Sequence, residues 1–109
     1  MDYTISFFNE AVQAEFDGWP VGLRARFRAL AIRMATFGPN LGMPHTRSMG
    51  DGLFEIRAKA EEGIGRTFYC TLVGRRIVIL HGFIKKTVKT PQREITLARN
   101  RQREVLQHG

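Results

Sequence analysis

The order of apolar and polar residues first predicts two helices. In residues 20–37, apolar side chains recur at spacings of four and three, which places them along one stripe of a helix: Leu23, Phe27, Leu30, Met34 and Phe37. A shorter helix is expected at 9–17, and the Gly-Trp-Pro turn at 18–20 separates the two. A Gly-Pro pair at 38–39 ends the longer helix. The pattern therefore predicts a helical hairpin whose apolar stripe covers another part of the core.

Four segments are rich in β-branched and aromatic residues, and these predict strands. A short strand is expected at 2–7, and three longer runs follow at 53–60, 67–73 and 76–84. Glycine turns at 63–65 and 74–75 separate the longer runs, which is typical of antiparallel neighbours. Residues 38–52 are rich in Gly, Pro, Asn and Asp, so we expect a loop there.

The first and third of the longer runs differ in pattern. In the run 53–60, apolar residues alternate with Glu55, Arg57 and Lys59, so one face of this strand is expected to be charged and solvated. The run 76–84 is apolar throughout its middle, which predicts a central strand.

A last helix is predicted after Thr90-Pro91, because threonine caps helices and proline suits their first turn. Ile95, Ala98 and Val105 then recur at helical spacing. With 109 residues, the chain fits a single domain spanning residues 1–109. The predicted fold class is α+β, with helices packed on one side of a small antiparallel sheet.

The distribution of charge along the chain indicates what class of partner the protein could bind. The chain carries 17 basic and 10 acidic residues, a net charge of +7 with neutral histidines. Residues 1–52 contain five of each sign, so the whole excess lies in 53–109. Such asymmetry makes a polyanion a candidate partner, nucleic acid first, although a basic surface without a ligand is the alternative.

The sequence lacks the motifs that indicate disulfides, metal sites, nucleotide binding or a membrane span. Cys70 is the only cysteine, so an intramolecular disulfide is impossible and a cysteine-built metal site is not expected. P-loop, HExxH and EF-hand spacings are missing, and no nucleophile–base pair is evident, so neither a cofactor nor a metal is expected. No apolar run reaches the length of a membrane span, and the N-terminus has no basic signal region. The expected location is the cytoplasm.

Some isolated candidates have ordinary interpretations. His81 falls inside an apolar strand, where a hydrogen-bonded core histidine is expected, and His45 falls in the loop. Tyr69 could orient a base, but packing is the commoner role of a strand tyrosine.

Cations near the strand ends suggest one common patch. Arg57 lies on the charged face of the first long run, Arg66 opens the second, and Lys85 and Lys86 leave the third. Lysines at a strand exit can simply mark where a sheet meets water, but neighbouring strands can also bring all four side chains together. Arginine grips phosphate with two parallel hydrogen bonds, and lysine supplies a compact charge. The patch would suit a phosphate that gains charge during a reaction, and RNA brings its own nucleophile, the 2′-hydroxyl.

Several sequence blocks occur together over nearly the whole chain. They are Trp-Pro at 19–20, LGMP at 41–44, GLFEIR at 52–57, RTFY at 66–69, ILHGFIKKT at 79–87, KTP at 89–91 and an alanine-containing helix at 94–98. Together they resemble the RelE/HigB superfamily of bacterial toxins, specifically its phage-derived HigB-like branch.

This resemblance implies a RelE-like fold and a metal-independent endoribonuclease that cuts translated mRNA on the ribosome. It also implies a cognate antitoxin, often a helix-turn-helix protein in this branch, and a toxin–antitoxin heterotetramer as one possible assembly. By position it assigns Arg66 to the scissile phosphate and Arg57 to a phosphate or rRNA contact. Lys85 or Lys86 would stabilise charge or protonate the leaving oxygen. We expect further RNA contacts at Lys59, Lys89 and Arg93.

The sequence also departs from RelE. Lysines on the first long strand are replaced by Leu53 and Glu55, and the last helix contains no tyrosine. The general base and acid therefore stay open, and Glu55 is a candidate for a role that RelE gives to lysine. Two other functions stay open as well: a ParE-like non-catalytic inhibitor of DNA gyrase, and a non-toxic RNA- or ribosome-binding module.

Overall fold

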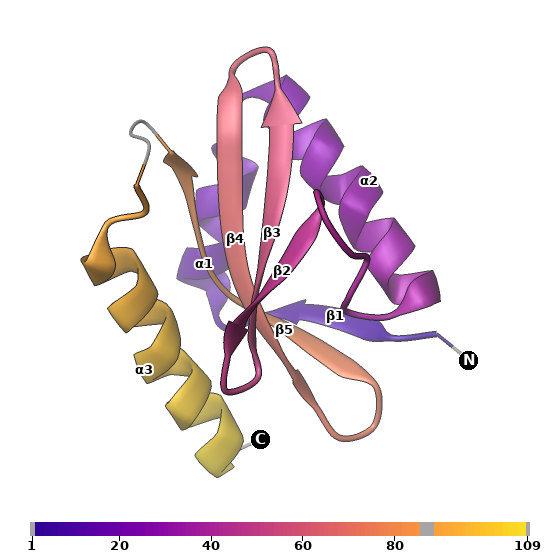
Figure 1. The fold of residues 1–109 in the computed structure, drawn as a ribbon, viewed down its shortest axis with the longest axis vertical. Coiled ribbons are helices and arrows are strands. Elements are labelled where there is room, and N and C mark those ends of the chain that lie inside the picture. Colours follow the sequence, from indigo (N-terminus) through magenta and orange to yellow (C-terminus); the bar gives the residue numbers. More distant parts are fainter. Residues whose placement is uncertain (1, 86–88, 109) are drawn as a thin grey trace.

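The computed structural model describes residues 2–85 and 89–108, which form helical layers on both faces of a central sheet (Figure 1). The elements in chain order are β1 (Thr4–Phe7), α1 (Glu10–Asp17), α2 (Val21–Phe37), β2 (Thr46–Gly50), β3 (Leu53–Ala60), β4 (Gly63–Leu72), β5 (Arg76–Lys85) and α3 (Gln92–His108). None of these helices has the length and apolarity that crossing a membrane requires. The predicted α+β fold class is confirmed.

The strands form one mixed sheet in the order β1-β5-β4-β3-β2. The neighbours β3–β4 and β4–β5 are antiparallel, as predicted for the three longer runs, and β2 is also antiparallel to β3. β1 lies parallel to β5 at one edge, with Ile5 opposite Ile77 and Phe7 opposite Ile79. The first strand thus extends the antiparallel part of the sheet by a parallel pair.

Two segments differ from the expectation for loops and turns. The sequence predicts a loop throughout 38–52, but residues 46–50 form the edge strand β2, with Arg47 opposite Glu55. This segment lacks a β-branched or aromatic pattern, so its strand state depends on pairing with β3. β4 begins at Gly63, and the turn between β3 and β4 lies at 61–62 rather than at 63–65.

The helical hairpin forms where the apolar stripe predicts it. The Asn9 side chain caps α1 by accepting a hydrogen bond of 2.9 Å from the Val12 backbone N–H. The first turn of α2 has no such cap of its own, and Gly22 N donates to Glu62 Oε2 at 3.0 Å. The stripe residues buried by α2 are Leu23, Phe27, Leu30 and Met34, whereas Phe37 at its end is exposed.

Aromatic rings hold the hairpin against one face of the sheet. Phe16 packs between Trp19 and Phe27 with tilted rings, at ring-centroid distances of 4.5 and 4.6 Å. Gly82 of β5 faces this cluster, and a Cβ atom there would overlap the Phe16 ring. The close approach of α1 to β5 therefore requires glycine at this position.

The centre of the sheet is apolar on both faces. Ile56, Tyr69 and Ile79 pack in the cluster that contains the hairpin. Phe68 and Leu80 belong to a second buried cluster, which α3 covers. The expectation that all helices pack on one side is therefore wrong, because central strands with apolar residues at consecutive positions have two faces to bury.

α3 is also fastened to the sheet by polar contacts. Arg99 and Gln102 donate hydrogen bonds to backbone carbonyls of residues 49–51, in and beside the β2–β3 turn. His81 Nε2 of β5 lies 2.8 Å from Glu94 Oε1, so the expected hydrogen-bonded histidine is confirmed. α3 lies beside the β2–β3 turn, and the β3–β4 turn lies at the opposite end of these strands (Figure 1).

Candidate functional site

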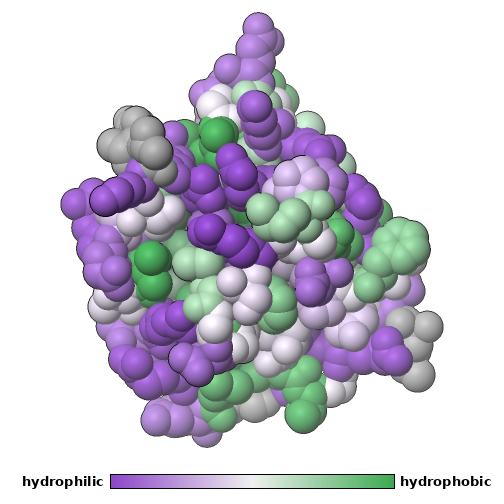
Figure 2. All heavy atoms as spheres, viewed as in Figure 1, coloured by the Kyte–Doolittle hydropathy of each residue, from purple (hydrophilic) through white to green (hydrophobic). Residues whose placement is uncertain are grey.

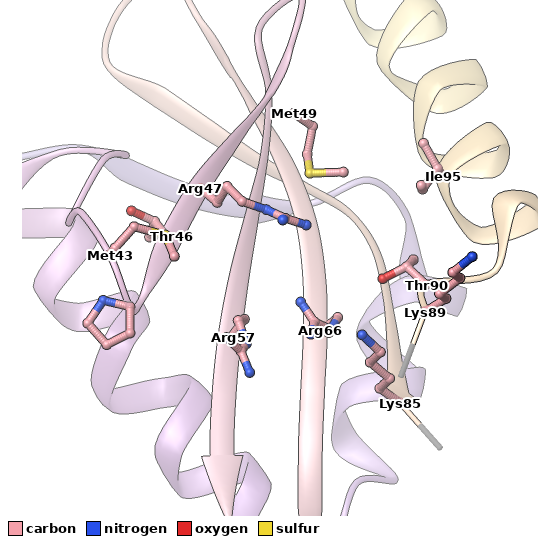
Figure 3. Close-up of a pocket in the computed structure, with 11 residues that line it drawn as sticks. Met43, Thr46, Arg47, Met49, Arg57, Arg66, Lys85, Lys89, Thr90 and Ile95 are labelled. Carbon is pink, nitrogen blue, oxygen red and sulfur yellow. The ribbon is translucent and has the colours of Figure 1, made fainter. Parts of the chain in front are cut away.

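Cationic side chains of β3, β4 and β5 share one face of the sheet. Arg57 and Arg66 lie directly opposite each other in β3 and β4. Lys85 of β5 lies opposite residue 64, two positions from Arg66 along β4, so its side chain projects from the same face. Figure 3 shows the three side chains next to one another across the three strands. These are three of the four cations that the sequence predicts to meet.

The three cations line a cavity of about 390 Å³ (Figure 3). Its other walls come from the loop before β2, from β2 itself, and from the segment between β5 and α3 together with α3. Besides Arg57, Arg66 and Lys85, the lining contains Arg47, Lys89, Met43, Pro44, Thr46, Met49, Thr90 and Ile95. On the face viewed in Figure 2, hydrophilic residues predominate and hydrophobic ones are scattered among them.

The structure does not bring every predicted site residue to this cavity. Lys89 lines it together with the strand cations. Lys59 is exposed on β3, two residues beyond Arg57, and Arg93 is exposed on α3; neither side chain lines the cavity. Lys86 lies outside the described residues.

A buried carboxylate lies beside these cations, although the sequence placed it in solvent. Glu55 has no exposed surface. Its Oε1 accepts a hydrogen bond of 2.7 Å from Arg66 Nη1 and one of 3.3 Å from Arg47 Nη2. The prediction of a solvated charged face is therefore wrong at this position, because two guanidinium groups allow the carboxylate to be buried.

Arg47 is a functional candidate that the sequence reasoning missed. It lies on β2, directly opposite Glu55. The segment around Arg47 was predicted to be a loop, so its position beside the strand cations could not be expected. We call the four side chains Arg47, Arg57, Arg66 and Lys85 the basic cluster.

Electrostatic repulsion within the basic cluster favours an anionic ligand. Four cations beside the single carboxylate of Glu55 leave a formal charge of +3. Partial loss of hydration lowers the pKa of Lys85, and the positive charges of the three arginines lower it further, while Glu55 opposes the shift. A bound phosphate would relieve this repulsion and would meet both guanidinium and ammonium donors.

Other candidate residues have structural roles. Tyr69 is buried in the cluster on the hairpin side of the sheet, and its hydroxyl donates to the Pro39 carbonyl. Burial raises the pKa of this hydroxyl, and the expected packing role is confirmed. The His45 carbonyl accepts a hydrogen bond of 2.9 Å from Arg57 N. Among the described residues, no group of three or more His, Cys, Asp or Glu side chains is placed to hold a metal ion.

A family model described as "Phage derived protein Gp49-like" matches residues 14–103. The chain belongs to the Gp49-like family. The matched range contains every residue that lines the cavity in this Gp49-like protein. A comparison with curated protein sequences gives no significant match.

The Gp49-like protein is similar in structure to the toxin RelE of E. coli, whose structure was solved for an arginine-to-alanine double mutant in the free state. The TM-score is 0.60 at 13% sequence identity, and the alignment covers 93% of this chain and 98% of the RelE chain. At this identity the similarity shows the fold alone, and it confirms the predicted RelE-like fold. The assignment to the HigB-like branch stays a prediction.

Proposed function

We propose that this Gp49-like protein is the toxin of a toxin–antitoxin system and acts as a metal-independent endoribonuclease on translated mRNA. The observation that carries the proposal is that Arg57, Arg66 and Lys85, from three adjacent strands, line one cavity. The fold shared with a protein described as the toxin RelE supports the same function. Its partners would be mRNA, the ribosome and a cognate antitoxin of the helix-turn-helix type, all in the cytoplasm.

The basic cluster suits a reaction in which the RNA supplies the nucleophile. The 2′-oxygen attacks the adjacent phosphorus, the bond to the 5′-oxygen breaks, and a 2′,3′-cyclic phosphate and a 5′-hydroxyl result. Arg66 and Arg57 stabilise the negative charge that the phosphate gains in the transition state. The Lys85 ammonium gives a proton to the departing 5′-oxygen and regains one from solvent, while the 2′-hydroxyl proton leaves to water. The lowered pKa of Lys85 makes it a better acid than an ordinary lysine.

Mapping of RNA ends tests this function. Purified protein is added to ribosomes translating a defined mRNA, and to the same mRNA without ribosomes. We expect cuts inside translated codons, with cyclic phosphate at the upstream fragment and a hydroxyl at the downstream one. In cells, induced expression should stop growth with the same cuts. Intact mRNA in arrested cells would contradict the proposal.

The alternatives predict different outcomes of the same expression experiment. A ParE-like inhibitor of DNA gyrase would produce damaged DNA and unbroken transcripts. A non-toxic RNA- or ribosome-binding module would be harmless when overexpressed. The near-complete burial of Arg66 in the cavity supports phosphate chemistry over a diffuse basic surface, since a fixed guanidinium positions a phosphate accurately.

RNA binding is expected to weaken at alkaline pH as Lys85 loses its proton. A lysine carries its charge below its pKa and loses it above, so the lowered pKa moves this loss to a lower pH than usual. The measurement is the affinity for a 2′-O-methyl oligoribonucleotide, which cannot be cleaved, between about pH 7 and 10. Lys85→Arg is the matched control, because a guanidinium keeps its charge over this range. Equal pH dependence in both proteins would show that Lys85 does not contact the RNA.

A further inference from the structure

The carboxylate of Glu55 lies among groups that the proposed reaction uses. β3 places Glu55 two residues before Arg57, so both side chains project from the same face of the sheet. Arg47 of β2 lies directly opposite Glu55. The carboxylate is fully buried, and the Arg66 side chain that contacts it is only 9% exposed. Glu55 therefore touches the guanidinium expected to hold the scissile phosphate.

The contact between Glu55 and Arg66 joins only one guanidinium nitrogen to one carboxylate oxygen. Arg66 Nη1 donates to Oε1 at 2.7 Å, and the same oxygen accepts the Arg47 bond. Oε2 of Glu55 and Nε of Arg66 are buried and have no hydrogen-bond partner among the described residues. A two-bond pair would occupy two nitrogens and both oxygens. The single bond instead fixes the guanidinium at one corner and leaves its other nitrogens without a bond to the carboxylate.

Burial of Glu55 opposes both stability and the attraction of an anion. Taking a carboxylate out of water is unfavourable unless ion pairs and hydrogen bonds offset the lost hydration, and Oε2 of Glu55 has no such bond among the described residues. Its charge also lowers the formal charge of the basic cluster from +4 to +3. A residue that weakens the electrostatic attraction of RNA does not favour binding. We therefore expect Glu55 to act in the reaction step.

We propose that Glu55 is a positioning residue, which orients the Arg66 guanidinium toward the scissile phosphate and at the same time weakens non-specific RNA binding. This inference rests on the proposed function. It predicts that cleavage and binding respond to loss of the Glu55 charge in opposite directions. A residue that only supports the fold would lower both together.

Glu55→Gln tests the assignment, because glutamine keeps the length of the side chain and removes its charge. We expect the single-turnover rate of RNA cleavage to fall by about 10²-fold, the loss typical of a misplaced catalytic group. Affinity for the 2′-O-methyl oligoribonucleotide should increase, with a steeper dependence on salt. Glu61→Gln removes the same charge from the exposed β3–β4 turn and should cleave at the wild-type rate.

Glu55→Asp provides the second arm, and circular dichroism establishes that each variant is folded. Aspartate keeps the charge but is one methylene shorter, so the 2.7 Å bond to Arg66 opens. We expect slower cleavage with unchanged affinity for the analogue, and this variant decides the question if Glu55→Gln does not fold. The pH profile of the rate should keep its shape in both variants.

Several outcomes would overturn the assignment. A folded Glu55→Gln protein that cleaves at the wild-type rate would remove any role for Glu55 in positioning. A parallel loss of cleavage, affinity and melting temperature would make the residue structural, and a lost acidic limb of the pH profile would make it a general base. A wild-type protein that cuts no RNA would instead overturn the proposed function, and the inference with it.

Discussion

Replacing Arg66 with lysine is expected to lower the single-turnover rate of RNA cleavage by about 10²- to 10³-fold, the loss typical of removing a transition-state donor. Arg66 is 7% exposed, lines the cavity and is held by Glu55. Lysine keeps the positive charge beside the carboxylate but cannot offer the planar pair of donors that fits a phosphate. The measurement is single-turnover cleavage at saturating enzyme.

Alanine at the same position is a less informative variant. Arg66→Ala would leave Glu55 fully buried with Arg47 as its only hydrogen-bonded partner among the described residues. Breaking a buried ion pair by removing one partner costs about 3–5 kcal/mol, so lost activity would be confounded with lost stability. Arg33→Ala, which removes an exposed cation of α2 on the other face of the sheet, serves as the control and should leave cleavage close to the wild-type rate. A folded Arg66→Lys protein with normal activity would exclude Arg66 from the reaction.

The meeting of Arg57 and Arg66 could be predicted from the sequence because it depends only on local rules. Alternation in the run 53–60 fixes the face of Arg57, and a tight turn between antiparallel strands brings the next run beside it. The turn was misplaced by two residues, at 63–65 rather than 61–62, but Arg57 and Arg66 still meet in the resulting register. The position of Lys85 does not follow from alternation alone, because the β4–β5 pairing shifts its register between Phe68 and Tyr69 and so moves Lys85 to the face of Arg66.

The burial of Glu55 could not be predicted, because it depends on elements that are distant in sequence. Alternation correctly places this side chain on the face of Arg57, but it cannot say what covers that face. The partner Arg47 comes from β2, whose residues do not show a strand pattern and whose pairing with β3 holds them extended. A strand state imposed by tertiary pairing is the kind that local propensity misses.

The second helical layer has a sequence signal in the consecutive apolar residues of β4. Phe68, Tyr69 and Cys70 are consecutive and all buried, so β4 presents apolar side chains to both faces. Such a run is typical of a strand covered on both sides. It predicts a second layer, and α3 with its buried Ala98 supplies one. The basic cluster therefore occupies the same face as α3, opposite the hairpin.

Leu30→Ala is expected to destabilise the protein by about 2–5 kcal/mol, the range for a buried leucine truncated in a core. Leu30 is fully buried on α2 in the cluster that joins the hairpin to the sheet. Ile32→Ala is the matched control on the same helix, because Ile32 is 62% exposed and should change the free energy of unfolding by less than about 0.5 kcal/mol. The measurement is urea denaturation, with an unchanged slope expected for both variants.

The same pair of variants separates the fold from the site. α2 packs on the opposite face of the sheet from the basic cluster, so Leu30→Ala should lower the fraction of folded protein without altering the cleavage rate of the molecules that remain folded. Cleavage per folded molecule is obtained by dividing the cleavage rate by the fraction of folded protein that the urea curve gives under the conditions of the assay. A rate per folded molecule that falls with Leu30→Ala but not with Ile32→Ala would mean that packing beneath β3 sets the geometry of Arg57 and Arg66. In that case the hairpin would belong to the catalytic architecture rather than only to the core.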